Sequence, residues 1–254
     1  MRLIVNADDF GYSWGQNYGI IDAYQKGIVR STSLMVGGMA ASHALELAQG
    51  NPGLGVGLHL VLDYGRPVSS PHLISSLVDS AGAFLRPVFE GPLDLNISEV
   101  ELEWRAQILW VQDKGIQLTH LDSHHHFHLH SQLFAVTCQL AKEFDLPIRT
   151  LPFQWPEGGV FADLSTLKVP DVSLVDFYGP GVGEAFFTNF FASYPQFRDS
   201  TVEVMCHPAY LDDFLLGASS YTLPRVRELQ VLKAPAVAKW AEKNGIELIN
   251  YRGL

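Results

Sequence analysis

Cysteine is scarce in this sequence, and positive charge is scarcer than negative charge. Two cysteines among 254 residues cannot build a disulfide framework, which excludes the small disulfide-stapled secreted domains. The chain has 17 lysines and arginines against 27 aspartates and glutamates, for a formal net charge of -10, and it has no basic run. This balance argues against nucleic acids and other polyanions as partners.

Long apolar runs are also missing. No stretch reaches the roughly 18 consecutive apolar residues of a membrane span, so we expect no membrane contact. Carboxylates appear at Asp8 and Asp9, too early for a signal peptide, and we therefore expect a cytoplasmic protein. With 47% hydrophobic residues the chain can bury a large core, and we expect one domain spanning residues 1–254.

Short apolar, β-branched segments alternate with helical patterns along the chain. This alternation is typical of a parallel α/β sheet or barrel. The segments 63–96 and 150–200 are instead rich in prolines and glycines, and we interpret both as long and irregular, the first as a loop or lid. The predicted strands are 3–5, 31–36, 55–60, 117–121, 146–149, 201–206 and 246–249, and the predicted helices are 14–26, 40–49, 98–114, 131–144 and 224–243.

Unusual polar residues lie at or just beyond the ends of the predicted strands. In parallel sheets and α/β barrels the carboxyl ends of the strands form the active-site face. Several strands therefore deliver reactive side chains to one rim. These residues are Asp8, Asp9, His59, the segment 120–124, Arg149 and His207.

The densest of these motifs is a histidine cluster. Six of the ten histidines lie in the eleven residues 120–130. Because alternate residues of a strand share a side, His120, Asp122 and His124 would face the same way. A solvated polar loop is the alternative, but neutral imidazole is a common metal ligand and the density favours a metal or catalytic site. One ion cannot take all six rings, so others orient ligands or contact substrate, and we assign His126 to the substrate.

The first and third predicted strands end in candidate metal ligands, and for each of them a structural role is the alternative. Adjacent carboxylates such as Asp8 and Asp9 point in opposed directions on a regular strand, but both can reach one site if the strand breaks at its turn. An ordinary strand-end turn is the alternative. A single histidine on an apolar strand, such as His59, is more often a core residue, although its position at a strand end favours a role at the rim.

The strand 201–206 leads into His207, which precedes a proline. A histidine at such a turn can act as a general acid or base. Cys206 does not pair with it as a nucleophile, because neighbouring residues on a strand face opposite ways. We therefore expect Cys206 to be a small core residue.

These motifs resemble those of the YdjC-like carbohydrate deacetylases, and specifically the chitooligosaccharide (chitin disaccharide) deacetylases. The resemblance runs through most of the chain, and the long histidine motif together with NADDFG and MCHPA is highly specific. The matching segments are NADDFG at 6–11, GQNYGII at 15–21, STS at 31–33, GLHLVL at 57–62, THLDSHHHFH at 119–128, EVMCHPAY at 203–210 and PRVRELQVL at 224–232.

The resemblance implies a TIM-barrel-like (β/α) fold, one divalent metal ion and a homodimer. It implies metal ligands at Asp9, His59 and His124, and it suggests Asp8 as the catalytic base. Proteins of this family are described with Mg²⁺. Two imidazoles and one carboxylate suit Zn²⁺ or another transition metal better, so the metal stays open.

The implied reaction is hydrolysis of the N-acetyl group of a small chitin-type oligosaccharide such as diacetylchitobiose, with release of acetate. The metal would polarise the carbonyl and stabilise the oxyanion. Asp8 would take a proton from water, and His207 would protonate the leaving amine. Arg149 would position Asp8, bind a sugar hydroxyl or form a structural salt bridge.

Three aromatic residues of the second irregular segment, Trp155, Phe177 and Tyr178, could stack on a sugar or pack within the loop, and we assign Tyr178 to the substrate. Two other functions remain as alternatives. A metal-dependent phosphoesterase would also use histidines and aspartates, but it would need more cationic side chains around the phosphate. A non-catalytic metal-binding or sugar-binding protein would need no acid or base.

Overall fold

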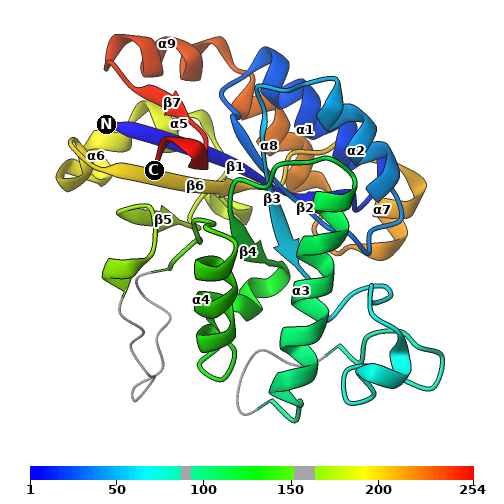
Figure 1. The fold of residues 1–254 in the computed structure, drawn as a ribbon. Helices are drawn as coiled ribbons and strands as arrows, with labels where there is room; N and C mark the ends of the chain where they lie inside the picture. Colours follow the sequence, from blue (N-terminus) through cyan, green and yellow to red (C-terminus); the bar gives the residue numbers. More distant parts are fainter. Residues whose placement is uncertain (87–92, 152–163) are drawn as a thin grey trace.

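The computed structural model describes residues 1–86, 93–151 and 164–254 (Figure 1). Seven strands form one sheet in the order β4-β3-β2-β1-β6-β5, with β7 also paired to β1, and every pairing between them is parallel. The strands are β1 (Arg2–Phe10), β2 (Ser31–Leu34), β3 (Gly55–Leu60), β4 (Leu121–Ser123), β5 (Val172–Leu174), β6 (Thr201–Cys206) and β7 (Glu247–Ile249).

The sheet curls into a half-barrel with helices outside it, which is the expected TIM-barrel-like α/β fold (Figure 1). Strands β1 to β6 are buried almost throughout, as is usual when a parallel sheet is covered on both faces. The helices are α1 (Trp14–Lys26), α2 (Ala41–Gln49), α3 (Ile97–Asp113), α4 (Phe134–Glu143), α5 (Glu184–Thr188), α6 (Phe190–Ser193), α7 (Asp213–Ala218), α8 (Leu223–Leu232) and α9 (Pro235–Lys243).

Several predicted elements have different bounds in the structure. The strand expected at 117–121 begins only at Leu121, and the strand expected at 146–149 is a single parallel bridge between Leu121 and Ile148. The helix expected over 224–243 is two helices, because Pro235 has no N–H to continue α8 and begins α9 instead. The irregular segment 150–200 contains β5, α5 and α6. The segment 63–86 is irregular as expected, apart from a short 3₁₀ turn at Pro71–Leu73.

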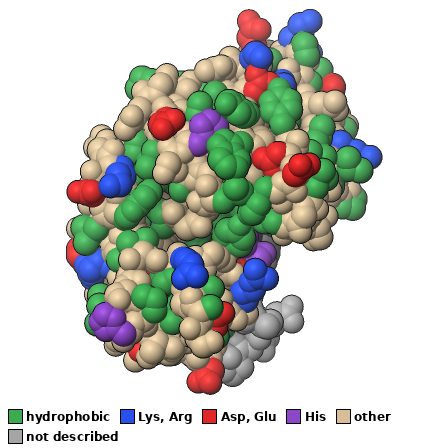
Figure 2. All heavy atoms as spheres, turned by 90° about the vertical axis from the view of Figure 1, so that its right-hand side faces the viewer, with side chains coloured by type: hydrophobic (Ala, Val, Ile, Leu, Met, Phe, Trp, Pro, Cys, Tyr) green, Lys and Arg blue, Asp and Glu red, His purple; other side chains and the backbone are tan. Residues whose placement is uncertain are grey.

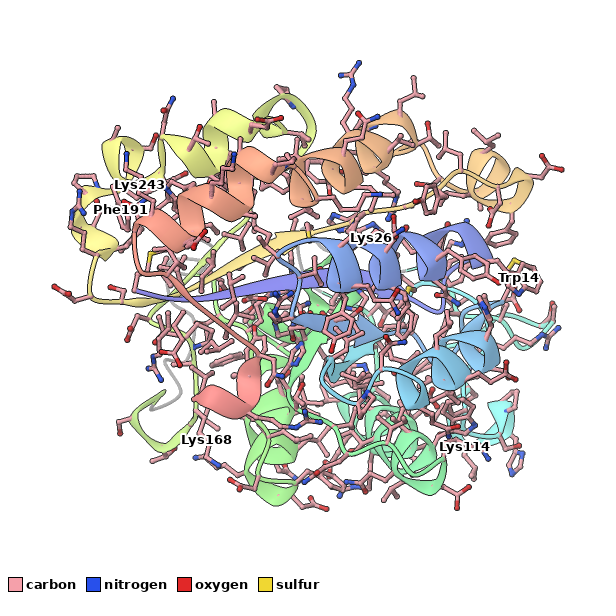
Figure 3. All side chains as sticks on the ribbon, turned by 90° about the horizontal axis from the view of Figure 1, so that it is seen from above. Trp14, Lys26, Lys114, Lys168, Phe191 and Lys243 are labelled. Carbon is pink, nitrogen blue, oxygen red and sulfur yellow. The ribbon has the colours of Figure 1, made fainter. Side chains whose placement is uncertain are left out.

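Helix α1 begins at the end of the molecule at which β1 finishes. Trp14, the first residue of α1, lies at the opposite end of the molecule from Phe191 and Lys243 (Figure 3). Figure 2 views the side toward which β1 runs and shows hydrophobic side chains gathered in a band across it. Within the described ranges, none of the helices combines the length and the apolarity that crossing a bilayer requires.

Candidate active site

The end of β1 breaks the regular strand geometry. Asp9 has a left-handed backbone with φ 67°, and the pairing of β1 with β2 shifts register between Ala7 and Phe10. On a regular strand the side chains of Asp8 and Asp9 would face opposite ways. The break lets both carboxylates approach His59, and both contribute to its electrostatic environment. The tight turn after Asp9 needs Gly11, whose φ of 99° favours glycine.

Asp8 is buried and held by an arginine from the segment beyond β4. Arg149 donates from Nη1 to Asp8 Oδ2 and from Nη2 to Asp8 Oδ1, both at 2.7 Å, and Asn6 adds a hydrogen bond of 2.8 Å to Oδ1. Burial alone would raise the pKa of Asp8, but the Arg149 guanidinium lowers it below its ordinary value. The carboxylate therefore stays ionised, with one lone pair of Oδ2 not used by these bonds.

Arg149 itself is fully buried, and its guanidinium is occupied by three carboxylates. Besides Asp8 it contacts Asp122 Oδ2 at 2.9 Å and Glu203 Oε1 at 2.8 Å. A bidentate fork of this kind fixes the orientation of its partner. Of the roles considered for Arg149, this geometry favours the positioning of Asp8 over direct contact with a sugar.

Asp9 turns toward a histidine and a second buried arginine. Its Oδ2 accepts a hydrogen bond of 2.8 Å from Arg225 Nη1, and its Oδ1 lies 3.5 Å from His59 Nε2. Burial would raise the pKa of Asp9, but Arg225 and the nearby histidines hold it far below its ordinary value. Asp9 Oδ1 is buried without a hydrogen-bond partner among the described residues. A buried carboxylate oxygen of this kind is an available cation ligand.

His59 and His124 are each oriented by a buried carboxylate. His59 donates from Nδ1 to Asp122 Oδ1 at 2.8 Å, and His124 donates from Nδ1 to Asp63 Oδ1 at 2.8 Å. The two ring centroids are 6.0 Å apart. An outer carboxylate on Nδ1 holds a proton on that nitrogen and leaves Nε2 as the nitrogen that can face a metal, the arrangement typical of metal-binding histidines.

Among the described residues, two groups of donor atoms could hold a cation, and each has its atoms within 4.8 Å of one another. One group is Asp8, His59 and Asp122, and the other is Asp63, His124 and His125. The expected ligand set of Asp9, His59 and His124 coincides with neither group, because His59 belongs to the first, His124 to the second and Asp9 to neither. The free Asp9 oxygen and the two oriented rings fit a divalent metal, and this ligand set stays a prediction.

His207 follows β6 and faces the same region. Its backbone N–H donates to Glu228 Oε2, and its Nδ1 is buried without a hydrogen-bond partner in the described part of the chain. Burial lowers the pKa of His207 to about 4 despite the opposing charge of Asp9. The imidazole is therefore neutral near pH 7.

Tyr178 lies beside His207 and is 44% exposed. Its ring stacks on Tyr221 with centroids 4.0 Å apart and meets the His207 ring edge-on at 5.7 Å. Phe177 is fully buried and packs on Phe186 and Phe187, so it belongs to the core and offers no sugar contact. Trp155 lies outside the described residues.

The remaining histidines of the cluster divide into structural and site residues. His120 stacks on Tyr251 with centroids 3.8 Å apart, and His128 is held by the Ser123 hydroxyl at 2.7 Å. Both rings are buried and serve the fold. His125 donates to Asp63 Oδ2 at 2.5 Å, and His126 has a buried Nδ1 with no described partner. Burial lowers the pKa of His126 to about 3, and Arg149 and Asp8 are among the charges that act on it.

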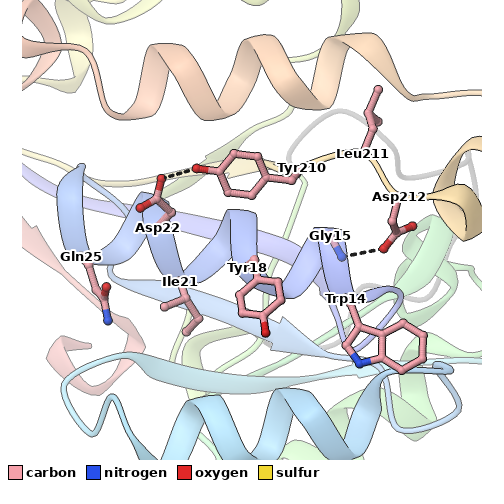
Figure 4. A pocket seen from close by; sticks show the side chains of 9 residues that line it. All are labelled: Trp14, Gly15, Tyr18, Ile21, Asp22, Gln25, Tyr210, Leu211 and Asp212. Atoms are coloured by element: carbon pink, nitrogen blue, oxygen red, sulfur yellow. Dashed lines mark hydrogen bonds between the residues drawn. The ribbon is translucent and has the colours of Figure 1, made fainter.

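An open pocket of about 570 Å³ lies near this region, between α1 and the segment that follows β6 (Figure 4). Trp14 and Tyr18 line it from α1, and Tyr210 donates a hydrogen bond of 2.6 Å across it to Asp22. Its walls are separate from the carboxylates and histidines described above.

Sequence reasoning missed four buried charged residues of this region. Asp63 directly follows the GLHLVL motif, and Arg225 and Glu228 lie within the matched segment 224–232, so the motifs contained these residues without showing their roles. Glu203 lies at an inward-facing position of β6, and its carboxylate accepts hydrogen bonds from Ser173 and Arg149. Only the fold shows which charges are buried and paired.

Comparison with known proteins shows the family of this chain. The family model described as YdjC-like protein matches residues 2–243. The chain belongs to the YdjC-like family. It is 42% identical to a carbohydrate deacetylase of Geobacillus stearothermophilus over 98% of this chain and 96% of the relative, and 39% identical to a chitooligosaccharide deacetylase of Yersinia enterocolitica over 98% and 97%.

A solved structure supports the fold of this YdjC-like chain. A crystal structure of an Enterococcus faecalis protein, provisionally described as a cellobiose-phosphate cleavage protein, superposes with a TM-score of 0.91. It is 32% identical and covers 99% of this chain and 98% of that one. The likeness extends over almost the full length of both chains and is not confined to one segment.

Proposed function

We propose that the protein is a metal-dependent carbohydrate deacetylase that hydrolyses the N-acetyl amide of a small chitin-type oligosaccharide. One observation carries the proposal. A buried carboxylate oxygen of Asp9 has no hydrogen-bond partner among the described residues and lies 3.5 Å from His59 Nε2, and His59 and His124 both have Nδ1 tied to a carboxylate. The names of the two deacetylase relatives support the same reaction.

Asp9, His59 and His124 would hold the metal. A divalent cation held there would supply Lewis acidity that activates the attacking water and the acetyl carbonyl. Two imidazole nitrogens favour Zn²⁺, Co²⁺, Ni²⁺ or Mn²⁺ by ligand type, whereas the family resemblance points to Mg²⁺. Metal analysis of protein purified without an affinity tag distinguishes these cations.

Asp8 and His207 would handle the protons. Asp8 is ionised, and its Oδ2 keeps a lone pair for the proton that the attacking water gives up. Water attack on the carbonyl carbon forms the C–O bond, and breaking of the C–N bond leaves an amine that needs a proton. His207 is neutral at rest, so we propose that it relays the released proton to this amine.

The sugar would lie against Tyr178 and His126. Tyr178 is exposed while its ring is supported by Tyr221, which suits an apolar platform for a sugar ring. His126 offers a buried ring nitrogen, Nδ1, that a sugar hydroxyl or the acetamide could satisfy. A homodimer and a cytoplasmic location remain part of this proposal.

Phosphate release is the competing reaction, and the arginines do not favour it. Arg149 is saturated by three carboxylates, and Arg225 is buried and bonded to Asp9 and Gln16. Neither guanidinium is available to a phosphate without breaking a buried ion pair.

The test is acetate release from diacetylchitobiose by protein stripped of metal and reloaded with single cations. We expect turnover only with metal, and its loss in Asp9→Asn and His59→Gln. His72→Gln is the matched control, because His72 is an exposed histidine bonded to Ser70 in the 63–86 segment. Release of phosphate from phosphorylated disaccharides without acetate release, or metal binding without any turnover, would overturn the proposal.

A further inference from the structure

Helix α8 places two buried ionisable side chains toward the candidate site from outside the sheet. Arg225 and Glu228 are three residues apart and so share one face of the helix. Both are buried, with exposed fractions of 6% and 0%. Buried ionisable groups persist only where specific partners satisfy them, so the partners indicate what this face of α8 serves.

Arg225 connects α8 to the end of β1. Its Nη1 donates to Asp9 Oδ2 at 2.8 Å and to Gln16 Oε1 at 3.0 Å, and its Nε donates to the carbonyl of Tyr221 at 2.7 Å. One guanidinium therefore fixes a candidate metal ligand and the segment that precedes α8 in a single arrangement.

Glu228 connects the same helix to His207. It accepts the backbone N–H of His207 at Oε2 and the Tyr221 hydroxyl at Oε1, the latter at 2.5 Å. The Tyr221 hydroxyl in turn accepts the Gly179 N–H at 2.9 Å, and the Tyr221 ring supports Tyr178. The His207 turn and the Tyr178–Gly179 segment are thus both anchored to one buried carboxyl group.

We propose that Glu228 is a positioning residue that holds the His207 imidazole and the Tyr178 platform in a fixed relation to each other. The proposal rests on the proposed function, in which His207 delivers a proton and Tyr178 supports the sugar. The amine that takes up the proton is carried by the sugar itself, so the two protein groups that serve them need a common support. Glu228 touches neither substrate nor the reacting atoms and acts through His207 and Tyr221.

The decisive experiment is a double-mutant cycle on acetate release with Glu228→Gln and His207→Ala. Gln keeps the size of Glu228, but when its oxygen accepts the His207 N–H its NH₂ group faces the Tyr221 hydroxyl, whose proton then has no acceptor on residue 228. A shift of the ring by about 1 Å is worth up to roughly 100-fold in rate, and we expect kcat to fall about 10- to 100-fold in Glu228→Gln. In the His207→Ala background the same change should lower kcat by less than about twofold.

A merely structural Glu228 would give a different result. It would lower kcat equally in both backgrounds, and that result would overturn the proposal, as would an unchanged kcat in Glu228→Gln. Tyr221→Phe tests the second arm, because it keeps the ring stack but removes the hydroxyl that joins Glu228 to Gly179. We expect this variant to raise KM for the disaccharide more than it lowers kcat.

A readout without turnover keeps this proposal separate from the reaction itself. Amide hydrogen exchange of His207 reports the bond to Glu228 directly, and we expect its protection to fall at least about tenfold in Glu228→Ala while the amides of β1 stay protected. Equal protection of His207 in both proteins would refute the positioning role. Wild-type protein that shows this protection but releases no acetate would refute the proposed function alone.

Discussion

Asp63 offers the sharpest test of the candidate metal site, because both of its carboxylate oxygens are bonded to histidines of the site. Its two oxygens accept Nδ1–H from His124 and His125 at 2.8 and 2.5 Å. Asn at this position has one acceptor and one NH₂ group. Whichever ring faces the NH₂ must present a bare Nδ1 and carry its proton on Nε2, the tautomer that cannot bind a metal through that atom.

The expected loss follows from this geometry. Removal of an outer-shell partner costs about 10- to 100-fold in metal affinity, which is about 1.4–2.7 kcal/mol. We expect Asp63→Asn to lie toward the upper end of that range, because the Asp63 carboxylate is only 7% exposed and serves two rings. At saturating metal, kcat should recover most of its wild-type value, since no group that handles protons has changed.

The measurement is competition between the metal-free protein and a chromophoric chelator at fixed pH. Asp79→Asn is the matched control, because Asp79 is an aspartate of the same irregular segment whose Oδ1 accepts the N–H groups of Ala81 and Ala83. A dissociation constant for Asp63→Asn within about twofold of the wild-type value would refute the reasoning. His124 would then not be a ligand oriented by Asp63.

Three further predictions concern the platform, the protons and the core. Tyr178→Ala should raise KM for the disaccharide about tenfold with a smaller change in kcat. Tyr178→Phe is the control, because it keeps the stack on Tyr221. Equal KM and kcat in the wild type and both variants would contradict the platform role. Burial lowers the pKa of His59, but Asp122 and the neighbouring aspartates raise it to about 9. Below that pH, metal binding should therefore release a proton from His59, and the metal affinity should increase as the pH rises toward 9. Calorimetry in buffers of different ionisation enthalpy measures that proton, and a pH-independent affinity would exclude His59 as a ligand. Gly57→Ala should destabilise the fold by about 1–3 kcal/mol in urea denaturation, because the added methyl group would lie 2.2 Å from the His120 ring; an unchanged midpoint would show that this ring moves freely.

Local patterns predict much of the fold because buried parallel strands have continuous apolar runs. The strand at 55–60, the strand at 201–206 and the helix at 14–26 have the predicted bounds. Strand β5 escapes this reasoning because its three residues lie among prolines and glycines and gain their place only by pairing with β6. The break before α9 has a local signal in Pro235, which the helical periodicity of 224–243 obscures.

The candidate site is predictable to a smaller extent. Position at a strand end picks out Asp8, Asp9 and His59 because the topology brings those ends together. Nothing local distinguishes Arg225, which is buried against Asp9, from Arg227, which is exposed two residues later. Charges of this kind acquire a role from the partner that the fold supplies, and that partner is distant in sequence.

Backbone strain explains why neighbouring polar residues can converge at this rim. Asp9, His125 and His126 have left-handed backbones with φ of 67°, 50° and 59°, at a cost of order 1–3 kcal/mol each. On a regular strand Asp8 and Asp9 would face opposite sides, and the consecutive His124 and His125 could not both reach Asp63. Aspartate and histidine tolerate this conformation better than most residues, so the residue types that suit the chemistry also permit the turn. A hydrophobic pattern does not predict this left-handed conformation, because the conformation does not change which residues are apolar or how they are spaced. The precise geometry of the site therefore depends on packing around β1 and β4 that holds these strained residues in place, and variants that loosen this packing should lose metal affinity before they lose the fold.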